Sequence, residues 1–168
     1  MADKVSLRDY QHDLVQRLRS TESGRIASRL GVQAGSERWL VDLADADEVV
    51  PVPDISAVPL TRSWFKGVAS IRGNLYSVVD FPAFLGGTGV AVGEQSRLLL
   101  IGARFRMGSA LLVDRSLGLL SPERLNLREG ATQSPWLKAE YDDVEGKLWK
   151  ELDMAQLVSH PDFVVVAS

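Results

Sequence analysis

Apolar residues alternate with more polar ones along much of the chain, a period of two that is typical of half-buried β-strands. Residues 30–34 form one such series, Gly35-Ser36 interrupts it, and the alternation resumes over 39–43. Because a glycine and a small polar residue between two alternating runs favour a tight reversal, we expect a β-hairpin that turns at Gly35-Ser36.

The same reasoning predicts further strands, over 68–71, 75–81, 97–103, 109–114, 136–141 and 146–152. Arg72-Gly73-Asn74 and Asp142-Asp143 are the expected turns within two of these pairs. The segment 49–53 is predicted to be an edge or irregular strand, because Pro51 and Pro53 cannot donate to a strand ladder.

Helical patterns are short. Apolar residues at spacings of three and four from Leu7 to Leu18 predict an amphipathic helix that ends near Gly24. Single helical turns are expected at 61–67, where Thr61 is the N-cap and Gly67 the stop, and after Ser121-Pro122. A last helix begins at Asp153.

These elements divide the chain into a helical extension over 1–25, a body over 26–160 and an apolar tail over 161–168 that must pack or bind something. Within the body, one strand set covers about 26–86 and another about 95–152, which predicts a mainly β protein of two small barrels. The pattern leaves open which strands the two barrels exchange. The glycine-rich segment 86–94 lacks the spacing of a phosphate loop, and a strand follows it, so we interpret it as a flexible connector.

Composition excludes several kinds of function. The 168 residues carry a net charge of −3, which gives no positive field for nucleic acid or anionic lipid. There is no cysteine, and His12 and His160 are the two histidines, so neither a metal nor another cofactor is expected. No apolar run is long enough to suggest membrane insertion, and we expect a cytoplasmic protein.

Candidate catalytic groups are few. Carboxylates cluster at Asp42, Asp45, Asp47 and Glu48, without the glycine and spacing of a calcium loop. Asp142-Asp143 is interpreted as a turn, and no serine has the sequence context of a nucleophile. The sequence therefore favours a binding module over an enzyme, with a small hydrolase left as a remote alternative. Trp39 and Trp149, at strand positions, are expected in the core.

The block 65–81, FKGVASIRGNLYSVVDF, closely resembles the signature of the CheW-like coupling proteins. Ser70 stands where that family usually has asparagine, and Phe81 replaces a leucine. The resemblance implies two packed SH3-like five-stranded β barrels. Trp64-Phe65, the turn at Arg72 and His160-Pro161 look most like members of type IV pilus chemosensory systems, which control twitching motility.

The resemblance also implies a function and a site. Proteins of this family connect the cytoplasmic tip of a methyl-accepting receptor to a CheA-type histidine kinase in membrane receptor arrays. Carried over by position, the implied receptor-binding residues are Glu48, Val49, Gly67 and Arg72, and no kinase-binding residue is assigned. A module that binds the kinase without a receptor is the alternative. The residues alone leave open whether Arg72 is only a solvated turn residue.

Overall fold

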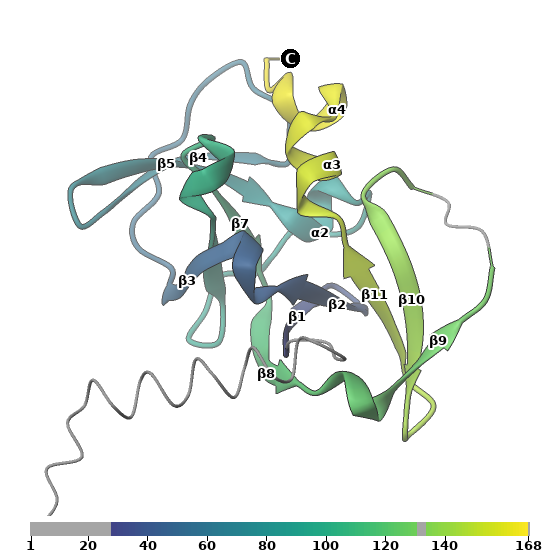
Figure 1. The fold of residues 1–168 in the computed structure, drawn as a ribbon. Coiled ribbons are helices and arrows are strands. Elements are labelled where there is room, and N and C mark those ends of the chain that lie inside the picture. Colours follow the sequence, from purple (N-terminus) through teal and green to yellow (C-terminus); the bar gives the residue numbers. More distant parts are fainter. Residues whose placement is uncertain (1–27, 131–133, 168) are drawn as a thin grey trace, which may run out of the picture.

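A computed structural model describes residues 28–130 and 134–167, and it has the mainly β fold that the alternating pattern predicts (Figure 1). Its strands form two sheets, of six and five strands. The predicted helix over 1–25, and His12 with it, lies outside the described residues. None of the helices within the described ranges is long and apolar enough to cross a membrane.

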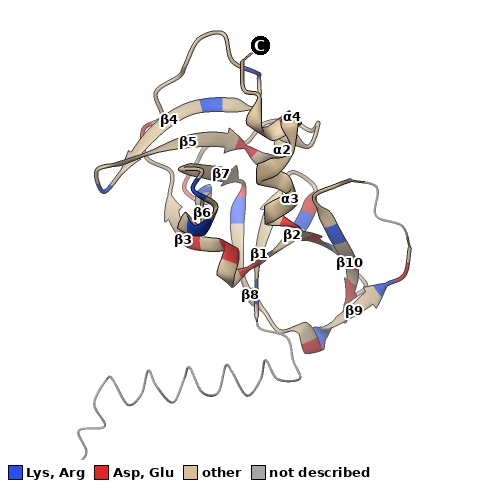
Figure 2. Ribbon diagram, turned by 45° about the horizontal axis from the view of Figure 1, so that its top comes forward, with Lys and Arg blue, Asp and Glu red and all other residues tan. Residues whose placement is uncertain are grey.

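The six-stranded sheet curls round until its two edges approach each other (Figure 2). In spatial order, its strands are β8 (Arg115–Leu120), β1 (Arg29–Ala34), β2 (Glu37–Asp42), β11 (Leu148–Leu152), β10 (Leu137–Asp143) and β9 (Leu125–Arg128). Only a 3-10 turn, η3 (Pro122–Arg124), separates the edge strands β8 and β9 in sequence. Such a short connection between the edges forces the sheet into a barrel.

The five-stranded sheet also closes on itself. In spatial order, its strands are β3 (Ala46–Pro51), β6 (Arg97–Ile101), β7 (Ser109–Val113), β5 (Asn74–Asp80) and β4 (Phe65–Ile71). The chain beyond β3 reaches β4, where Ser56 and Val68 exchange backbone hydrogen bonds of 2.8 and 2.9 Å. The predicted edge strand at 49–53 is thus found as β3, at one edge of this sheet.

The expected division into one barrel over 26–86 and a second over 95–152 is wrong. The six-stranded sheet combines β1 and β2 with strands from the second half, because β11 pairs in parallel with β2. The five-stranded sheet likewise joins β5 to β7 in parallel. Alternation shows that a strand exists, but it does not show which distant strand it pairs with.

Two clusters of buried side chains hold the sheets. One lies between the two sheets, and the other fills the interior of the five-stranded barrel. In β6, Leu99 and Ile101 belong to the cluster between the sheets, whereas Leu98 and Leu100 belong to the barrel interior. β6 is therefore buried on both faces. The expected core positions of Trp39 and Trp149 are confirmed, at 2% and 6% exposure.

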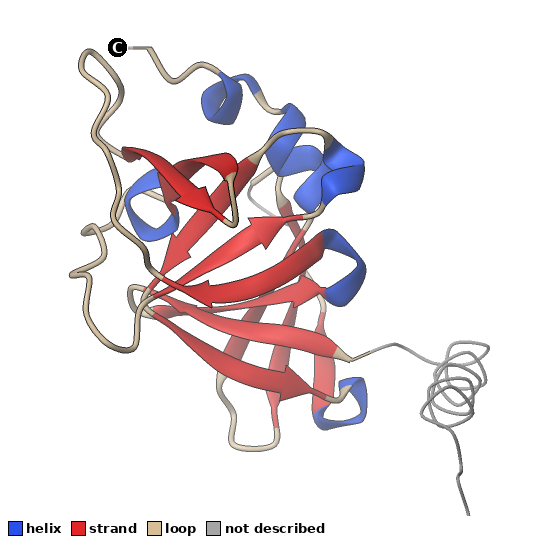
Figure 3. Cartoon of the chain, turned by 90° about the vertical axis from the view of Figure 1, so that its left-hand side faces the viewer, coloured by secondary structure: helices blue, strands red, loops and turns tan. Residues whose placement is uncertain are grey.

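Short helices lie at the ends of the strands (Figure 3). They are η1 (Leu43–Asp45), α2 (Phe81–Phe84), η2 (Ala103–Phe105), α3 (Met154–Ser159) and α4 (Pro161–Val164). As predicted, Asp153 caps α3, accepting a hydrogen bond from the backbone N–H of Gln156 at 3.1 Å. The apolar tail packs through Phe163, which is buried beside Trp64 and Phe84.

The predicted helical turn at 61–67 is wrong. Residues 62–65 form a hydrogen-bonded turn, and β4 already begins at Phe65. Gly67 lies inside this strand at a φ of 133°, and a Cβ there would come within 2.0 Å of the Ser56 carbonyl oxygen. This glycine is therefore required by the bridge that closes the barrel, and it does not end a helix.

Two further expectations are corrected. β10 continues through Asp143, so its turn with β11 lies two residues later than predicted, over 144–147. The connector 86–94 is tied to the body, because the buried Asp80 carboxylate accepts from the Val90 backbone N–H at 2.9 Å. At Gly89, a Cβ would approach this carboxylate to 2.8 Å, which explains one glycine of the segment.

Candidate functional site

Arg72 and Gly73 form the tip of the β4–β5 hairpin. Ile71 pairs with Asn74, which leaves two residues in the turn, with φ angles of 52° and 82°. Two positive φ angles are the signature of a tight hairpin turn whose twist matches that of the strands. An arginine in this left-handed region costs about 1–2 kcal/mol relative to glycine. A strained position of this kind is a reason to look for a function.

Glu48 lies across from this turn on β3. The β3–β6 register shifts between Ala46 and Glu48, a local irregularity of the edge strand. Arg72 Nη1 donates to Glu48 Oε2 at 2.6 Å, and Arg72 Nη2 donates to Glu48 Oε1. Two of the residues expected to bind the receptor, 24 positions apart, thus form one forked ion pair.

The ion pair is accessible to solvent. The side chain of Arg72 is 68% exposed and that of Glu48 is 36% exposed. The hydrogen bonds from Arg72 hold the pKa of Glu48 below its usual value, and Glu48 raises the pKa of Arg72 in return. Exposed pairs add little to stability. The fork instead fixes the orientation of both groups, while a guanidinium with five N–H groups keeps donors for a partner.

Leu75 is an exposed apolar residue near the tip of the same hairpin. It follows the turn on β5, opposite Ser70, and is 70% exposed. Period-two alternation places Leu75 on the same face as the buried Val79, so the sequence did not identify it as a surface residue. Leu75 is exposed, although Val79 is buried, because the hairpin tip projects beyond the barrel (Figure 1).

The other two expected site residues do not join the ion pair. Val49 is half-buried and packs against the cluster between the sheets, on the opposite face of β3 from Glu48. Gly67 is buried in β4, five residues before Arg72, where it permits the close approach of Ser56. Both support the shape of this barrel, whereas Glu48 and Arg72 present charge.

The acidic cluster at 42–48 does not converge on one point. Each carboxylate accepts from a different group of the protein: Asp42 from the Ala44 N–H, Asp45 from Arg104, Asp47 from the Ala103 N–H and Glu48 from Arg72. In the described part of the chain, no three histidine, aspartate or glutamate side chains are arranged to hold a metal ion. These carboxylates accept from backbone N–H groups or pair with arginines, and their geometry gives no support to a cation site.

The carboxylates considered for hydrolysis also have structural partners. Asp142 accepts from Arg128 Nη2 at 3.1 Å. Asp143 accepts from the Trp149 indole at 2.9 Å and from two backbone N–H groups of its turn. The Trp149 hydrogen bond is the main reason that the pKa of Asp143 lies below its usual value. Neither residue is held in a geometry that suggests acid or base catalysis.

Comparison with known proteins gives a consistent result. The model of the CheW-like domain family matches residues 29–162. The chain is 28% identical over 115 residues to Protein PilI of Pseudomonas aeruginosa, covering 64% of each protein. It is 34% identical over 92 residues to Chemotaxis protein CheW of Thermotoga maritima, covering 54% of this chain and 59% of that one. Both alignments thus span less than two thirds of the curated relatives.

A solved structure has the same fold. The crystal structure of scaffolding protein TtCheW from Thermoanaerobacter tengcongensis superposes with a TM-score of 0.60, at 16% sequence identity. The match covers 74% of this chain and 87% of that one.

Proposed function

The chain belongs to the CheW-like domain family, and from this premise we propose that it is a non-catalytic adaptor between a methyl-accepting chemoreceptor and a CheA-type histidine kinase. The adaptor works in the cytoplasm, where receptor arrays recruit it to the membrane. The similarity to Protein PilI supports a place in a type IV pilus chemosensory system, and so control of twitching motility.

The observation that carries the receptor half of this proposal is the ion pair between Arg72 and Glu48. Arg72 lies in the block that resembles the family signature, and the ion pair that it forms with Glu48 is exposed. A receptor tip made of helices offers carboxylates and helix-end carbonyls, which are the acceptors that a fork of N–H groups binds best.

The test measures binding of this chain to a receptor tip fragment and to the kinase, each from the same organism, by isothermal titration calorimetry. We expect Arg72→Glu to reduce receptor affinity at least tenfold and to leave kinase affinity unchanged. Receptor binding equal to that of the wild type would show that the site is wrong. Loss of both affinities, with an unchanged circular dichroism spectrum, would show that the turn is not specific to the receptor.

A charge exchange separates the pair from its individual members. Glu48→Arg combined with Arg72→Glu restores an ion pair of reversed direction at the same place. If Arg72 touches the receptor, we expect the double variant to bind as poorly as Arg72→Glu. Recovery of wild-type affinity would mean that the pair acts only by supporting the hairpin.

The kinase-only alternative predicts a different result. In that case the wild-type chain binds the kinase, and no receptor tip from the organism binds at any concentration that the calorimeter reaches. Co-purification from native cells of this chain with the kinase and a receptor would exclude that alternative.

A further inference from the structure

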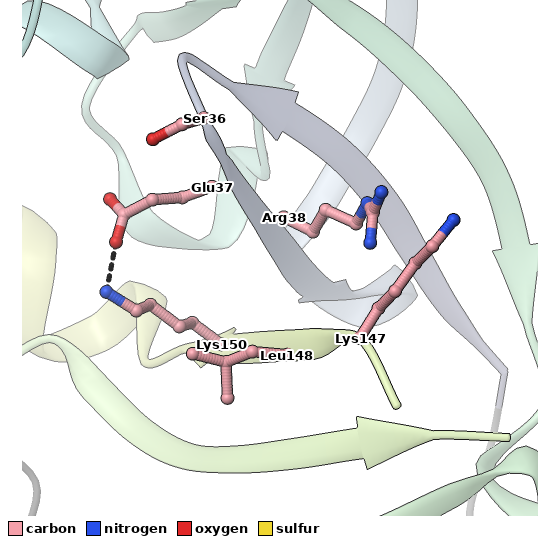
Figure 4. Close-up of a pocket in the computed structure, with 6 residues that line it drawn as sticks. All are labelled: Ser36, Glu37, Arg38, Lys147, Leu148 and Lys150. Atoms are coloured by element: carbon pink, nitrogen blue, oxygen red, sulfur yellow. Dashed lines mark hydrogen bonds and ion pairs between the residues drawn. The ribbon is translucent and has the colours of Figure 1, made fainter. Parts of the chain in front are cut away.

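The C-terminal tail departs from a strand that is firmly held in the six-stranded barrel. This strand is β11, and α3 begins two residues after it ends. Lys150 on β11 pairs with Glu37 on β2, as the dashed line in Figure 4 shows, and the two strands also pair in parallel. The base of the tail is therefore fixed to the six-stranded barrel.

Phe163 anchors the tail in an aromatic cluster that both barrels supply. Its ring stacks on Trp64, with ring centres 6.4 Å apart, and meets Phe84 edge-on at 5.6 Å. The Phe84 ring in turn lies 5.1 Å from that of Trp136. Trp64 directly precedes β4 of the five-stranded sheet, and Trp136 directly precedes β10 of the six-stranded sheet. The cluster thus joins the two barrels.

The end of the tail pairs with the loop that leads into β4. The Arg62 N–H donates to the Val166 carbonyl at 2.8 Å, and Arg62 Nε donates to the Val165 carbonyl at 3.2 Å. Thr61 and Ala167 form an isolated antiparallel β-bridge. A segment that follows the last strand of one barrel is therefore laid along a loop of the other.

The same loop closes the five-stranded barrel at its other end, where Ser56 and Val68 exchange backbone hydrogen bonds of 2.8 and 2.9 Å. Between the two points of attachment, Leu60 has a φ of 61° and is 83% exposed. A leucine in this left-handed region is strained, and such a conformation persists only where the surrounding contacts impose it. The loop is thus held in a strained shape by the bridge to β4 and by the tail.

We propose that the tail, residues 161–167, is a strap through which the six-stranded barrel keeps the five-stranded barrel closed. Release of the strap lets the strained loop relax, which weakens the bridge between Ser56 and Val68 and so the hold on β4. This strand leads into the Arg72 turn, so the strap connects one barrel to the candidate site on the other. The inference concerns the chain alone and does not depend on receptor coupling.

The strap can open while both barrels stay folded. Within residues 161–167, all of which the structure describes, Phe163 is the one buried residue. Val164 and Val165 are 52% and 50% exposed. A segment held by one buried side chain and a few hydrogen bonds opens at a lower free energy than the core strands do. Phe163 therefore controls the strap.

The test measures amide hydrogen exchange in the full chain by nuclear magnetic resonance. We expect Phe163→Ala to accelerate exchange of the Ser56 and Val68 amides at least tenfold, because their bridge loses its support. The matched control is Val41→Ala, which removes apolar volume from the same cluster between the sheets but leaves the tail contacts in place. In that control, both amides should exchange within twofold of the wild type.

A second variant fastens the strap instead of releasing it. The chain has no cysteine, so Thr61→Cys with Ala167→Cys introduces a single pair at the bridge between loop and tail. Opposed residues of an antiparallel bridge have Cα atoms about 4.5–5.5 Å apart, a distance that a disulfide spans. We expect the Ser56 and Val68 amides to exchange at least tenfold more slowly in the oxidised form than in the reduced form.

Three results would overturn the proposal. One is unchanged exchange of both amides in Phe163→Ala. Another is equal acceleration in Phe163→Ala and Val41→Ala, because the bridge would then open only when the whole chain unfolds. The third is equal exchange in the oxidised and reduced forms of the cysteine variant, and this comparison decides the matter alone if Phe163→Ala does not fold.

Discussion

Each of the two barrels carries an arginine–glutamate pair, and the two pairs have opposite environments. Arg29 and Glu151 pair at 3.1 Å in the six-stranded barrel, with side chains 15% and 4% exposed. Arg72 and Glu48 pair on the surface of the five-stranded barrel, 68% and 36% exposed. A charge buried with its partner cannot lose that partner without a large cost, whereas an exposed charge is solvated either way. The inner pair therefore maintains the fold, and the outer pair is available for binding.

The interiors of the two barrels differ in polarity. The five-stranded barrel is filled by aliphatic side chains such as Leu98 and Leu112. In the six-stranded barrel, Glu151 accepts from Arg29 Nε at 3.1 Å and from the Tyr141 hydroxyl at 2.9 Å. Burial and then this hydrogen bond raise the pKa of Tyr141 to about 12. The interior of the five-stranded barrel is thus filled by aliphatic side chains, whereas that of the six-stranded barrel contains Tyr141, whose folded pKa is raised.

Removing the buried carboxylate should give the largest effect. We expect Glu151→Ala to lower the free energy of unfolding by about 3–5 kcal/mol, because it removes the buried carboxylate that accepts from both Arg29 and Tyr141. Urea denaturation followed by tryptophan fluorescence measures this. Glu151→Gln is the matched control and should cost less, since its amide oxygen still accepts one hydrogen bond. If Glu151→Ala lowers the free energy of unfolding by less than a surface substitution does, the contrast between the buried and the exposed pair is wrong.

The buried network was not visible in the sequence, and the reason is the distance between its members. Caps and turns depend on neighbouring residues, so Asp153 and the hairpin at Gly35-Ser36 were found correctly. Arg29 and Glu151 are 122 residues apart. Their contact depends on the parallel pairing of β11 with β2, which a local pattern does not encode. The same pairing explains why the predicted division into successive barrels failed.

Raising the pH should reduce the contribution of Tyr141 to the free energy of unfolding. This effect should be smaller than that of Glu151→Ala. Because the folded pKa of Tyr141 lies above its unfolded value near 10, its contribution is complete below pH 10 and is lost as the pH rises toward 12. Tyr141→Phe should therefore cost about 1–2 kcal/mol at pH 8, a value reduced by the partial exposure of the ring. At pH 11.5, the difference in the free energy of unfolding between Tyr141→Phe and the wild type should be smaller.

The control for this pH dependence lies in the other barrel. Leu112→Ala opens a cavity in an aliphatic interior and should cost about 3 kcal/mol. That cost should be the same at pH 8 and pH 11.5, as measured by urea denaturation at both values. A Tyr141→Phe cost that is equally independent of pH would contradict the assigned network.

The family resemblance implied that Glu48 and Arg72 bind a receptor, and this stays a prediction. The structure adds that the two residues form an ion pair with each other. The resemblance could not show that Arg72 and Glu48 are in contact. Their contact depends on the bridge between Ser56 and Val68 that closes the barrel, and tertiary packing sets this bridge. Leu75 was missed because alternation assumes that a strand continues against the core, and this hairpin tip extends past it.

Changing the exposed pair of Arg72 and Glu48 should have the smallest effect on stability. This effect should be stabilising, unlike that of the other substitutions. Asn-Gly is the preferred sequence for a turn with two positive φ angles, and Arg72 occupies the asparagine position. We therefore expect Arg72→Asn to raise the thermal midpoint slightly, despite the loss of the ion pair with Glu48, and to weaken receptor binding at least tenfold. Differential scanning calorimetry and the binding titration measure the two quantities on one sample. If Arg72→Asn instead destabilises the protein as Glu151→Ala does, the outer pair supports the fold, and the strained turn would no longer indicate a residue retained for contact with a partner.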